Sequence, residues 1–426
     1  MNRLKTSRNL LALLIFVTIL AAACTRQTAT ESEEVQTNTS EPASPTAEAT
    51  PTPESAGQIE PSDSPSEAGS LDELAFDWNL VQVGEGIKPA IDTDAAGVVH
   101  IAFLTEDEQG GVFYGNNASG NFEVEKVSEG YFYGPLDLAV GPEGVPYIAY
   151  HDHQDTGFNP ELGDEVVAIL RDGSWDLETV KDAGHDGWDN SIVVDGAGNW
   201  YTAAVDPSQF NSESGVEYAT NAGGAISVVE VGSGPIVYEF GTSIQLDQDN
   251  LPGVAYYDNN LQGLAYAKFD GSSWSVEIVD ANGDAGRYAS LAYDANGSPS
   301  ISYFVFDGPN SGTVRFATLD GGEWIIEDVG TLNDVQPGQI GARKITALAF
   351  DGSGKAHIAY TDRSRIVYGQ RGEDGWALQE VPHLTDQSLG QLVEMAIDAD
   401  GKPHLIWYEL ETTSPLFGPI VYASPF

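Results

Sequence analysis

Cysteine and positively charged residues are the scarcest features of this 426-residue chain. It contains one Cys, and it has 18 Lys and Arg against 65 Asp and Glu, a formal net charge of −47. A single Cys excludes an intrachain disulfide and a cysteine-based zinc site. So few cations argue against a nucleic-acid partner, because Lys and Arg supply most of the affinity for phosphates. An anionic membrane surface would repel the chain as well.

Glycine, by contrast, is abundant, with 47 residues. This excess indicates many turns rather than long helices. The length allows two to four compact domains or one large repetitive domain.

The first 23 residues have the pattern of an export signal. Arg3, Lys5 and Arg8 precede an apolar run, Leu10–Ala23. This run is shorter than the ~20 residues that a membrane-spanning helix needs, and it fits the apolar region of a secretory signal.

The end of this signal, Leu20–Cys24, resembles a bacterial lipobox, in which small residues precede a Cys that receives the lipid. Ala21 stands where the family pattern has Leu. The resemblance implies a lipoprotein signal peptide over residues 1–23 and lipidation of Cys24. An ordinary secretory signal with a spare thiol is the alternative.

Residues 24–70 form a linker of mostly Thr, Ser, Pro, Glu and Ala, in which Val35 and Ile59 are the only large aliphatic residues. Such a segment buries too little apolar surface to offset chain entropy, so we expect it to be disordered. As a flexible coil it would reach roughly 40 Å. We therefore expect an extracytoplasmic protein, anchored by lipid to a bacterial cell membrane or to an outer membrane if one is present.

Residues 71–426 contain one sequence phrase that occurs seven times. An apolar run is followed by Asp-x-x-Gly and by a second apolar run that ends in an aromatic residue. The turns begin at intervals of 47, 54, 52, 47, 57 and 47 residues, at Asp94, Gly141, Asp195, Asp247, Asp294, Asp351 and Asp398. In the fourth copy Asn250 replaces the glycine, and Asn tolerates a positive φ. A period of about 50 residues is typical of propeller blades.

Each copy supplies four short β-type runs, and the two chain ends complement each other. The last copy ends after its third run, whereas a run of the fourth kind, residues 76–83, precedes the first copy. We therefore expect an all-β, seven-bladed β-propeller whose last blade combines one N-terminal strand with three C-terminal strands. Such closure removes exposed sheet edges. Two separate β-sandwiches, the alternative, would not explain the missing strand.

The turns before the fourth runs include Asp172–Trp175, Asp270–Trp274 and Asp320–Trp324. With the repeat, they resemble bacterial extracytoplasmic β-propellers, including the sialidase-type group with its neuraminidase repeats. The resemblance implies the propeller architecture. Sialidase Asp-boxes are longer and begin with a hydroxyl residue, and sialidases have six blades and an arginine triad. The resemblance therefore does not carry sialidase activity over to this chain.

Acidic residues end the second run of several copies: Asp152, Asp206, Asp258, Asp362 and Glu409. In a propeller this position lies at the loop face around the central channel. The acids either accept hydrogen bonds from backbone amides of the neighbouring blade or form a ring that binds a cation or sugar hydroxyls.

Histidines gather in two loops that the fold would make neighbours. Because successive side chains of a strand point to opposite faces, His151 and His153 lie on the same side of a strand end. His185 and Asp186 lie in the next loop. Imidazole and carboxylate groups could bind a divalent metal such as zinc or supply a general base. Polar surface histidines are the alternative, because the spacing matches no known metal motif.

The remaining candidates for ligand binding are rare cations and aromatic residues of the loop face. They are Arg287, Tyr288, Arg343, Lys344, Arg363, Tyr133, Trp188 and Trp407. Clustered cations could hold an anionic group, and the aromatic rings would offer flat faces to sugars, or else pack between blades. The segment Asp280–Asp284 resembles the start of a calcium loop but lacks its later ligands.

Three functions follow from these features. The first is a monomeric, membrane-anchored protein that binds a carbohydrate, peptide or protein without chemistry, since no catalytic constellation is recognisable. The second is an extracellular glycan hydrolase or lyase with a histidine-centred site. The third is an envelope scaffold.

Overall fold

Strands make up almost all of the regular structure. The computed structural model describes residues 74–105, 110–130, 134, 136–152, 163–181, 187–206, 215–233, 241–258, 260, 262–308, 311–333, 344–362, 364–385, 389–410 and 418–426. These residues contain strands β1 to β27 and one 3-10 helix, η1 (Pro142–Gly144). In this part of the chain, no helix has the length and apolar character needed to cross a membrane.

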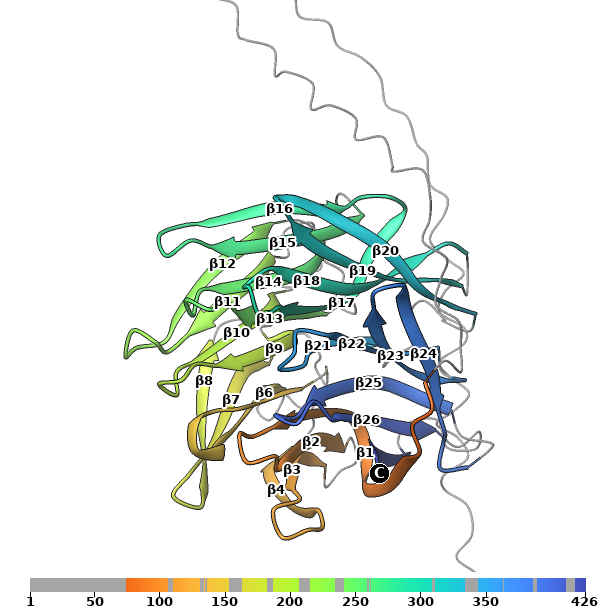
Figure 1. Ribbon diagram of the computed structural model, residues 1–426. Helices are drawn as coiled ribbons and strands as arrows, with labels where there is room; N and C mark the ends of the chain where they lie inside the picture. Colours follow the sequence, from red (N-terminus) through yellow and green to blue (C-terminus); the bar gives the residue numbers. More distant parts are fainter. Residues whose placement is uncertain are drawn as a thin grey trace, which may run out of the picture. The chain divides into compact units, whose positions relative to one another are not determined.

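Five antiparallel sheets contain four consecutive strands each (Figure 1). They comprise β5 (Asp137–Val140), β6 (Pro146–Asp152), β7 (Asp164–Arg171) and β8 (Ser174–Lys181); β9 (Trp188–Val194), β10 (Trp200–Asp206), β11 (Gly215–Thr220) and β12 (Ser227–Ser233); β13 (Thr242–Leu246), β14 (Pro252–Asp258), β15 (Gly263–Phe269) and β16 (Trp274–Asp280); β17 (Asp284–Tyr293), β18 (Pro299–Phe306), β19 (Gly312–Asp320) and β20 (Glu323–Leu332); and β21 (Thr346–Phe350), β22 (Ala356–Thr361), β23 (Ile366–Gly372) and β24 (Gly375–Val381).

The sixth sheet joins the two ends of the folded chain. Its order is β25 (Leu389–Ile397), β26 (Pro403–Leu410), β27 (Gly418–Pro425), β1 (Trp78–Thr93), β2 (Val99–Thr105), β3 (Gly111–Asn116) and β4 (Glu123–Glu129). Strand β1 is long enough to serve two neighbours. Its residues Trp78–Gly86 pair with β27, and Ile87–Thr93 pair with β2.

The strands thus form groups of four, which we number one to seven in chain order. The inner strands that begin these groups are Ile87–Thr93 of β1 and then β5, β9, β13, β17, β21 and β25, and each contacts the inner strands of its neighbours, including β25 with β1. The all-β chain of successive four-stranded sheets agrees with the predicted propeller class. We call the end with the first-to-second and third-to-fourth connections the turn end, and the opposite end the loop end.

The turn at the turn end explains the repeated Asp-x-x-Gly. In six groups the Asp side chain accepts hydrogen bonds from backbone N–H groups two and four residues later, as Asp94 does from Ala96 (2.9 Å) and Val98 (2.8 Å). The fourth residue is a glycine with positive φ or, in one group, Asn250 with φ 58°. The prediction for Asn250 is confirmed, and the acids of these turns are structural.

Aromatic side chains pack successive groups together on the outside. A ring near the start of a fourth strand meets the third-strand ring of the preceding group edge-on. The pairs are Trp175–Tyr114, Trp274–Tyr218, Trp324–Tyr266, Trp376–Phe316, Trp78–Tyr368 and Phe122–Tyr422, with centroids 5.0–5.6 Å apart.

Candidate functional site

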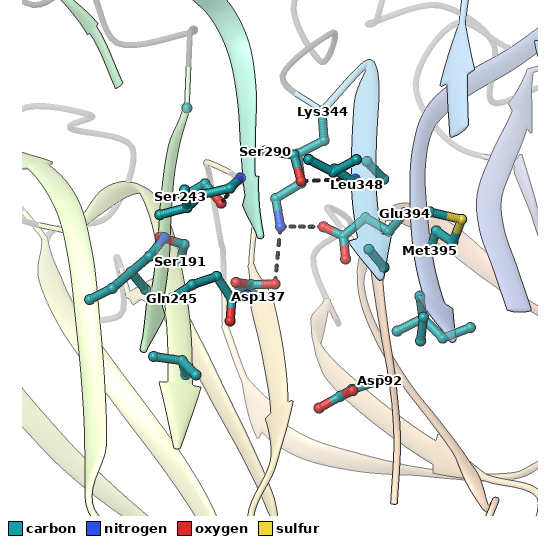
Figure 2. A pocket seen from close by; sticks show the side chains of 18 of the residues that line it. Asp92, Asp137, Ser191, Ser243, Gln245, Ser290, Lys344, Leu348, Glu394 and Met395 are labelled. Carbon is teal, nitrogen blue, oxygen red and sulfur yellow. Dashed lines mark hydrogen bonds and ion pairs between the residues drawn. The ribbon is translucent and has the colours of Figure 1, made fainter. Parts of the chain in front are cut away.

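A cavity of about 330 Å³ lies where the inner strands meet, and residues of all seven inner strands line it. Its polar lining includes Asp92, Asp137, Gln245, Lys344 and Glu394. Figure 2 shows these side chains together with serines of the neighbouring strands. We call this cavity the channel.

Side chains that face the channel also connect the inner strands. Asp137 accepts a hydrogen bond from the N–H of Ile192 in the next inner strand (2.9 Å). The same link recurs around the channel: Asp92 to Val140 (2.7 Å), Ser191 to Ile244 (3.1 Å), Ser243 to Leu291 (2.9 Å) and Ser290 to Leu348 (3.1 Å). Because buried N–H groups need acceptors, these polar residues are fixed in place.

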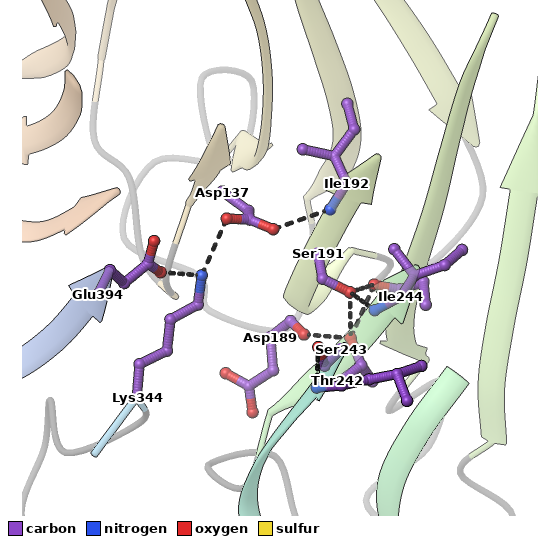
Figure 3. Close-up of polar contacts among 11 residues, drawn as sticks. Asp137, Asp189, Ser191, Ile192, Thr242, Ser243, Ile244, Lys344 and Glu394 are labelled. Carbon is purple, nitrogen blue, oxygen red and sulfur yellow. Dashed lines mark hydrogen bonds and ion pairs between the residues drawn. The ribbon is translucent and has the colours of Figure 1, made fainter. Parts of the chain in front are cut away.

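The charged groups of the channel converge on Lys344, which precedes β21 at the loop end. Its Nζ donates to Asp137 Oδ1 (3.1 Å) and also donates to Glu394 Oε1 (Figure 3). The ammonium therefore bridges strands β5 and β25, and its side chain keeps 19% of its surface open to the channel. Asp92 lies apart from this cluster, nearer the turn end (Figure 2).

Burial raises the pKa of two carboxyls in the channel. The pKa of Asp92 rises to about 7 because burial outweighs its hydrogen bonds from Val140 and Thr93. The pKa of Glu394 also rises to about 7 through burial, although Lys344 lowers it. The two carboxylates raise the pKa of Lys344. The channel therefore holds a cation at neutral pH and carboxyls that exchange protons near that pH.

On the loop-end side of the charged cluster, four inner strands contain β-bulges. In each of them the residue six positions before the turn has a φ of 51–57°: Lys88, Asp189, Tyr288 and Leu392. Residues other than glycine rarely adopt this backbone conformation. The β-sheet register slips there in all four strands. Figure 3 shows the carbonyl of Asp189 held by the hydroxyl of Thr242 (2.8 Å). Bulges of this kind are frequent beside functional sites, because they re-aim side chains.

The predicted acids at the ends of the second strands are engaged within the protein. Asp206 binds Lys181 Nζ (3.0 Å), and Asp258 accepts the N–H of Asn260 (2.9 Å). Asp362 accepts N–H groups of Ser364 and Arg365 and pairs with the Arg365 guanidinium (2.6 Å), and Glu409 accepts the N–H of Leu384 in the preceding loop (3.0 Å). Asp152 ends β6 opposite Asp164. Of these contacts, the one between Glu409 and Leu384 joins successive groups as the backbone-amide alternative requires, whereas Asp258 and Asp362 bind amides of their own loops and Asp206 binds a cation. Both interpretations of these acids stay predictions.

The histidine cluster is described only at His151. This side chain is fully buried, and its ring lies 5.1 Å from that of Trp188. A Cβ on Gly163 would lie 2.5 Å from His151 Nε2, so backbone covers this edge of the ring. The imidazole of His151 is therefore closed off from solvent, and its role in a metal site stays a prediction. His153, His185 and Asp186 lie outside the described residues, as does Cys24.

Several of the cations and aromatic rings expected to face a ligand at the loop face are paired or buried within the protein. Arg287 pairs with Asp284 (2.6 Å) and covers the rings of Tyr257 and Phe306, while Tyr288 is buried. Trp407 is fully buried and Trp188 nearly so. The expectation that these two tryptophans offer flat faces to a ligand is not supported, because protein covers them. Tyr133, Arg343 and Arg363 lie outside the described residues.

The segment that resembles a calcium loop uses its carboxylates for other contacts. Asp280 accepts hydrogen bonds from Tyr303 (2.8 Å) and Arg315 (3.0 Å), and Asp284 accepts one from Tyr257 (2.5 Å). Among the described residues, no three His, Cys, Asp or Glu side chains are arranged to hold a metal ion.

The channel residues Asp92, Asp137, Ser191, Ser243, Ser290 and Glu394 were missed by sequence reasoning. A signal for five of them exists in the repeat. The residue four positions before the turn is polar in five copies, as Asp137, Ser191, Ser243, Ser290 and Glu394. Aligning the first runs by their turns reveals it.

Comparison with known proteins gives likeness in fold alone. No protein-family model matches the chain, and no curated protein matches it. An ulvan lyase, solved with a bound saccharide, is 13% identical with a TM-score of 0.53, covering 82% of this chain and 96% of its own. The Aleuria aurantia lectin in complex with a fucose-containing saccharide is 15% identical (TM-score 0.46; 70% and 96% covered). The intramolecular trans-sialidase of Ruminococcus gnavus is 11% identical (TM-score 0.41; 82% and 96%).

Proposed function

We propose that this chain is a β-propeller that binds a carbohydrate at the loop end of its channel, without chemistry. The observation that carries the proposal is the convergence of Lys344, Asp137 and Glu394 in a cavity lined by every inner strand. Fixed donors and acceptors around a concave space are what sugar hydroxyls need for orientation. The glycan ligands of proteins with similar folds are compatible with this class of ligand.

The proposal includes a seven-bladed ring with a closing blade of one N-terminal and three C-terminal strands. Two observations support it: the pairing of Trp78–Gly86 with β27, and the contact of β25 with β1. It also includes export, lipidation at Cys24 and a disordered tether over residues 24–70, which rest on the sequence pattern.

A glycan-active enzyme is the second candidate, now centred on the channel. The observation that favours it is the pair of carboxyls, Asp92 and Glu394, whose pKa values of about 7 suit a general acid. Release of reducing sugar from a bound glycan would establish it. Binding without product would support the first candidate.

A glycan array probed with the purified protein, followed by calorimetry on the best saccharide, tests the proposal. Asp137→Asn and Glu394→Gln alter the charged cluster while keeping the size of the channel. Both should weaken binding at least tenfold. Lys402→Ala, in a turn at the turn end, is the matched control and should leave affinity unchanged. Equal affinities in all four proteins would overturn the proposal.

A further inference from the structure

At the turn end, a space between one group and the next is filled by an aromatic or imidazole ring at six of the seven junctions. In groups one, six and seven this ring is a histidine. His357 Nδ1 lies 2.7 Å from Tyr368 OH and its Nε2 lies 3.3 Å from Asp351, and His404 makes the same contacts with Tyr422 and Asp398. His100 contacts Tyr114 in the same way (2.6 Å), but its Nε2 lies 3.7 Å from Asp94. We call each of these sets of His, Tyr and Asp an array. The tyrosine of each array contacts an aromatic ring of the following group.

Tyrosines fill the same space at three further junctions. The hydroxyl of Tyr147 in group two reaches the carbonyl of Gly198 in group three (3.1 Å), and Tyr201 binds the turn residue Asp195 (3.0 Å). In group four Gly253 stands at the histidine position, and the hydroxyl of Tyr293 from group five enters the space and meets Tyr266 OH (2.7 Å).

The junction between groups five and six lacks such a ring. Ser300 stands at the histidine position, Phe316 at that of the tyrosine, and Thr318 at that of Asn116 and Gln370. Phe350 occupies the position of Tyr293 without a hydroxyl. A cavity of about 530 Å³ opens there, lined by Asp294, Thr318, Phe350, Lys355, Arg371 and Glu373, among others. The departure from the repeat therefore coincides with the cavity.

We propose that this cavity is a second ligand site, separate from the channel, and that it binds one neutral pyranose unit. Its ionic groups balance, two carboxylates against two cations, although the chain as a whole is strongly acidic. A neutral ligand fits this balance better than an anion or a cation.

The positions of the lining groups support a sugar. Arg371 is fixed over the Phe316 ring (5.5 Å) by its pair with Glu327 (2.6 Å), so its guanidinium is preorganised. The Thr318 hydroxyl is held by Ser300 (2.9 Å), and Phe350 is half-buried. Charged planar groups bind vicinal hydroxyls, and an aromatic wall receives the apolar face of a pyranose ring.

The repeat itself supplies the test. The substitutions Ser300→His, Phe316→Tyr and Thr318→Gln give group five the residues that group six has at these positions. Together they should fill the cavity. The experiment is saturation-transfer NMR of the intact protein with the methyl pyranosides of glucose, galactose, mannose and fucose. Transfer to at least one of them should occur in the Glu394→Gln protein, in which sugar binding in the channel is weakened, and it should fall at least tenfold when the three substitutions are added. Thermal unfolding checks that the variant folds.

Two matched lysines keep the test decisive if the filled variant does not fold. Lys355 and Lys402 occupy the same position in consecutive turns, and His357 and Tyr368 fill the junction beside Lys402. In the same Glu394→Gln background, Lys355→Ala should weaken the signal, whereas Lys402→Ala should not. No transfer to any pyranoside in the Glu394→Gln protein, or transfer that is equal with and without Lys355→Ala, would overturn the inference. The free amino acid alanine is added as a probe that is not a sugar. Transfer to alanine but to no pyranoside would also overturn the inference.

Discussion

Lys344 and Asp137 are 207 residues apart in sequence, yet Nζ of the first lies 3.1 Å from Oδ1 of the second. Glu394, on the neighbouring inner strand β25, binds the same ammonium. The cluster therefore ties together three groups of strands at the loop end of the channel, and its charge state depends on all three side chains.

Lys344→Met should destabilise the protein by about 2–4 kcal/mol at pH 7, because it leaves two carboxyls without their cation. The 19% exposure of the Lys344 side chain keeps this cost below that of a fully buried pair. The loss should shrink at pH 5, where Glu394 is protonated. Urea unfolding at both pH values measures it. Adding Asp137→Asn and Glu394→Gln should restore most of the stability, and an unchanged urea midpoint for Lys344→Met at pH 7 would contradict the description of the cluster.

Asp92→Asn should change the pH dependence of stability. Because burial raises the pKa of Asp92 from 3.8 to about 7, the folded state binds a proton that the unfolded state releases above pH 4. This difference in proton binding raises the free energy of unfolding of the wild type as pH falls from 7 to 4, by at most about 1.4 kcal/mol per pH unit. Unfolding free energies of the variant should lack this gain. A parallel profile for both proteins would show that Asp92 has an ordinary pKa.

His357→Gln should alter the profile with the opposite sign. Burial lowers the pKa of His357, so below pH 6.5 the unfolded chain takes up a proton that the folded protein does not. This proton uptake by the unfolded chain lowers the free energy of unfolding as pH falls through 6.5. The variant should be less stable than the wild type at pH 7, and the difference should narrow towards pH 5. A difference that is constant with pH would refute a neutral, buried His357.

Trp78→Ala should cost about 3–5 kcal/mol, the range for truncating a large buried aromatic side chain. Trp78 is buried on the N-terminal half of β1 and meets Tyr368 edge-on. Val81→Ala on the same strand is the control, because Val81 is 38% exposed, and its cost should stay within about 0.5 kcal/mol. Equal costs, measured by denaturant unfolding, would argue against a closing strand.

Cys24→Ser should abolish membrane anchorage. The wild-type protein, expressed in a bacterium, should partition into the detergent phase of a Triton X-114 extraction, and its mature N-terminus should begin at modified Cys24. The serine variant should partition into the aqueous phase. Identical partitioning would indicate an ordinary secretory signal.

The repeated turns could be predicted because their cause is local. An Asp that binds two nearby N–H groups and a glycine or Asn250 with positive φ are both visible in four consecutive residues. The channel was harder to predict because Asp137, Lys344 and Glu394 meet only when distant groups assemble. The burial of Trp407 was unpredictable for a related reason: an aromatic residue near a strand end suits a ligand face or a core equally well, and only packing against neighbouring groups decides.

The most direct test of the central claim is a crystal structure of the protein soaked with the saccharide that binds best on the array. We predict electron density for a sugar at the loop end of the channel, with a hydroxyl within hydrogen-bond distance of Lys344 Nζ or of the Glu394 carboxyl. A channel without sugar, in a crystal where the same saccharide occupies another site, would contradict the account.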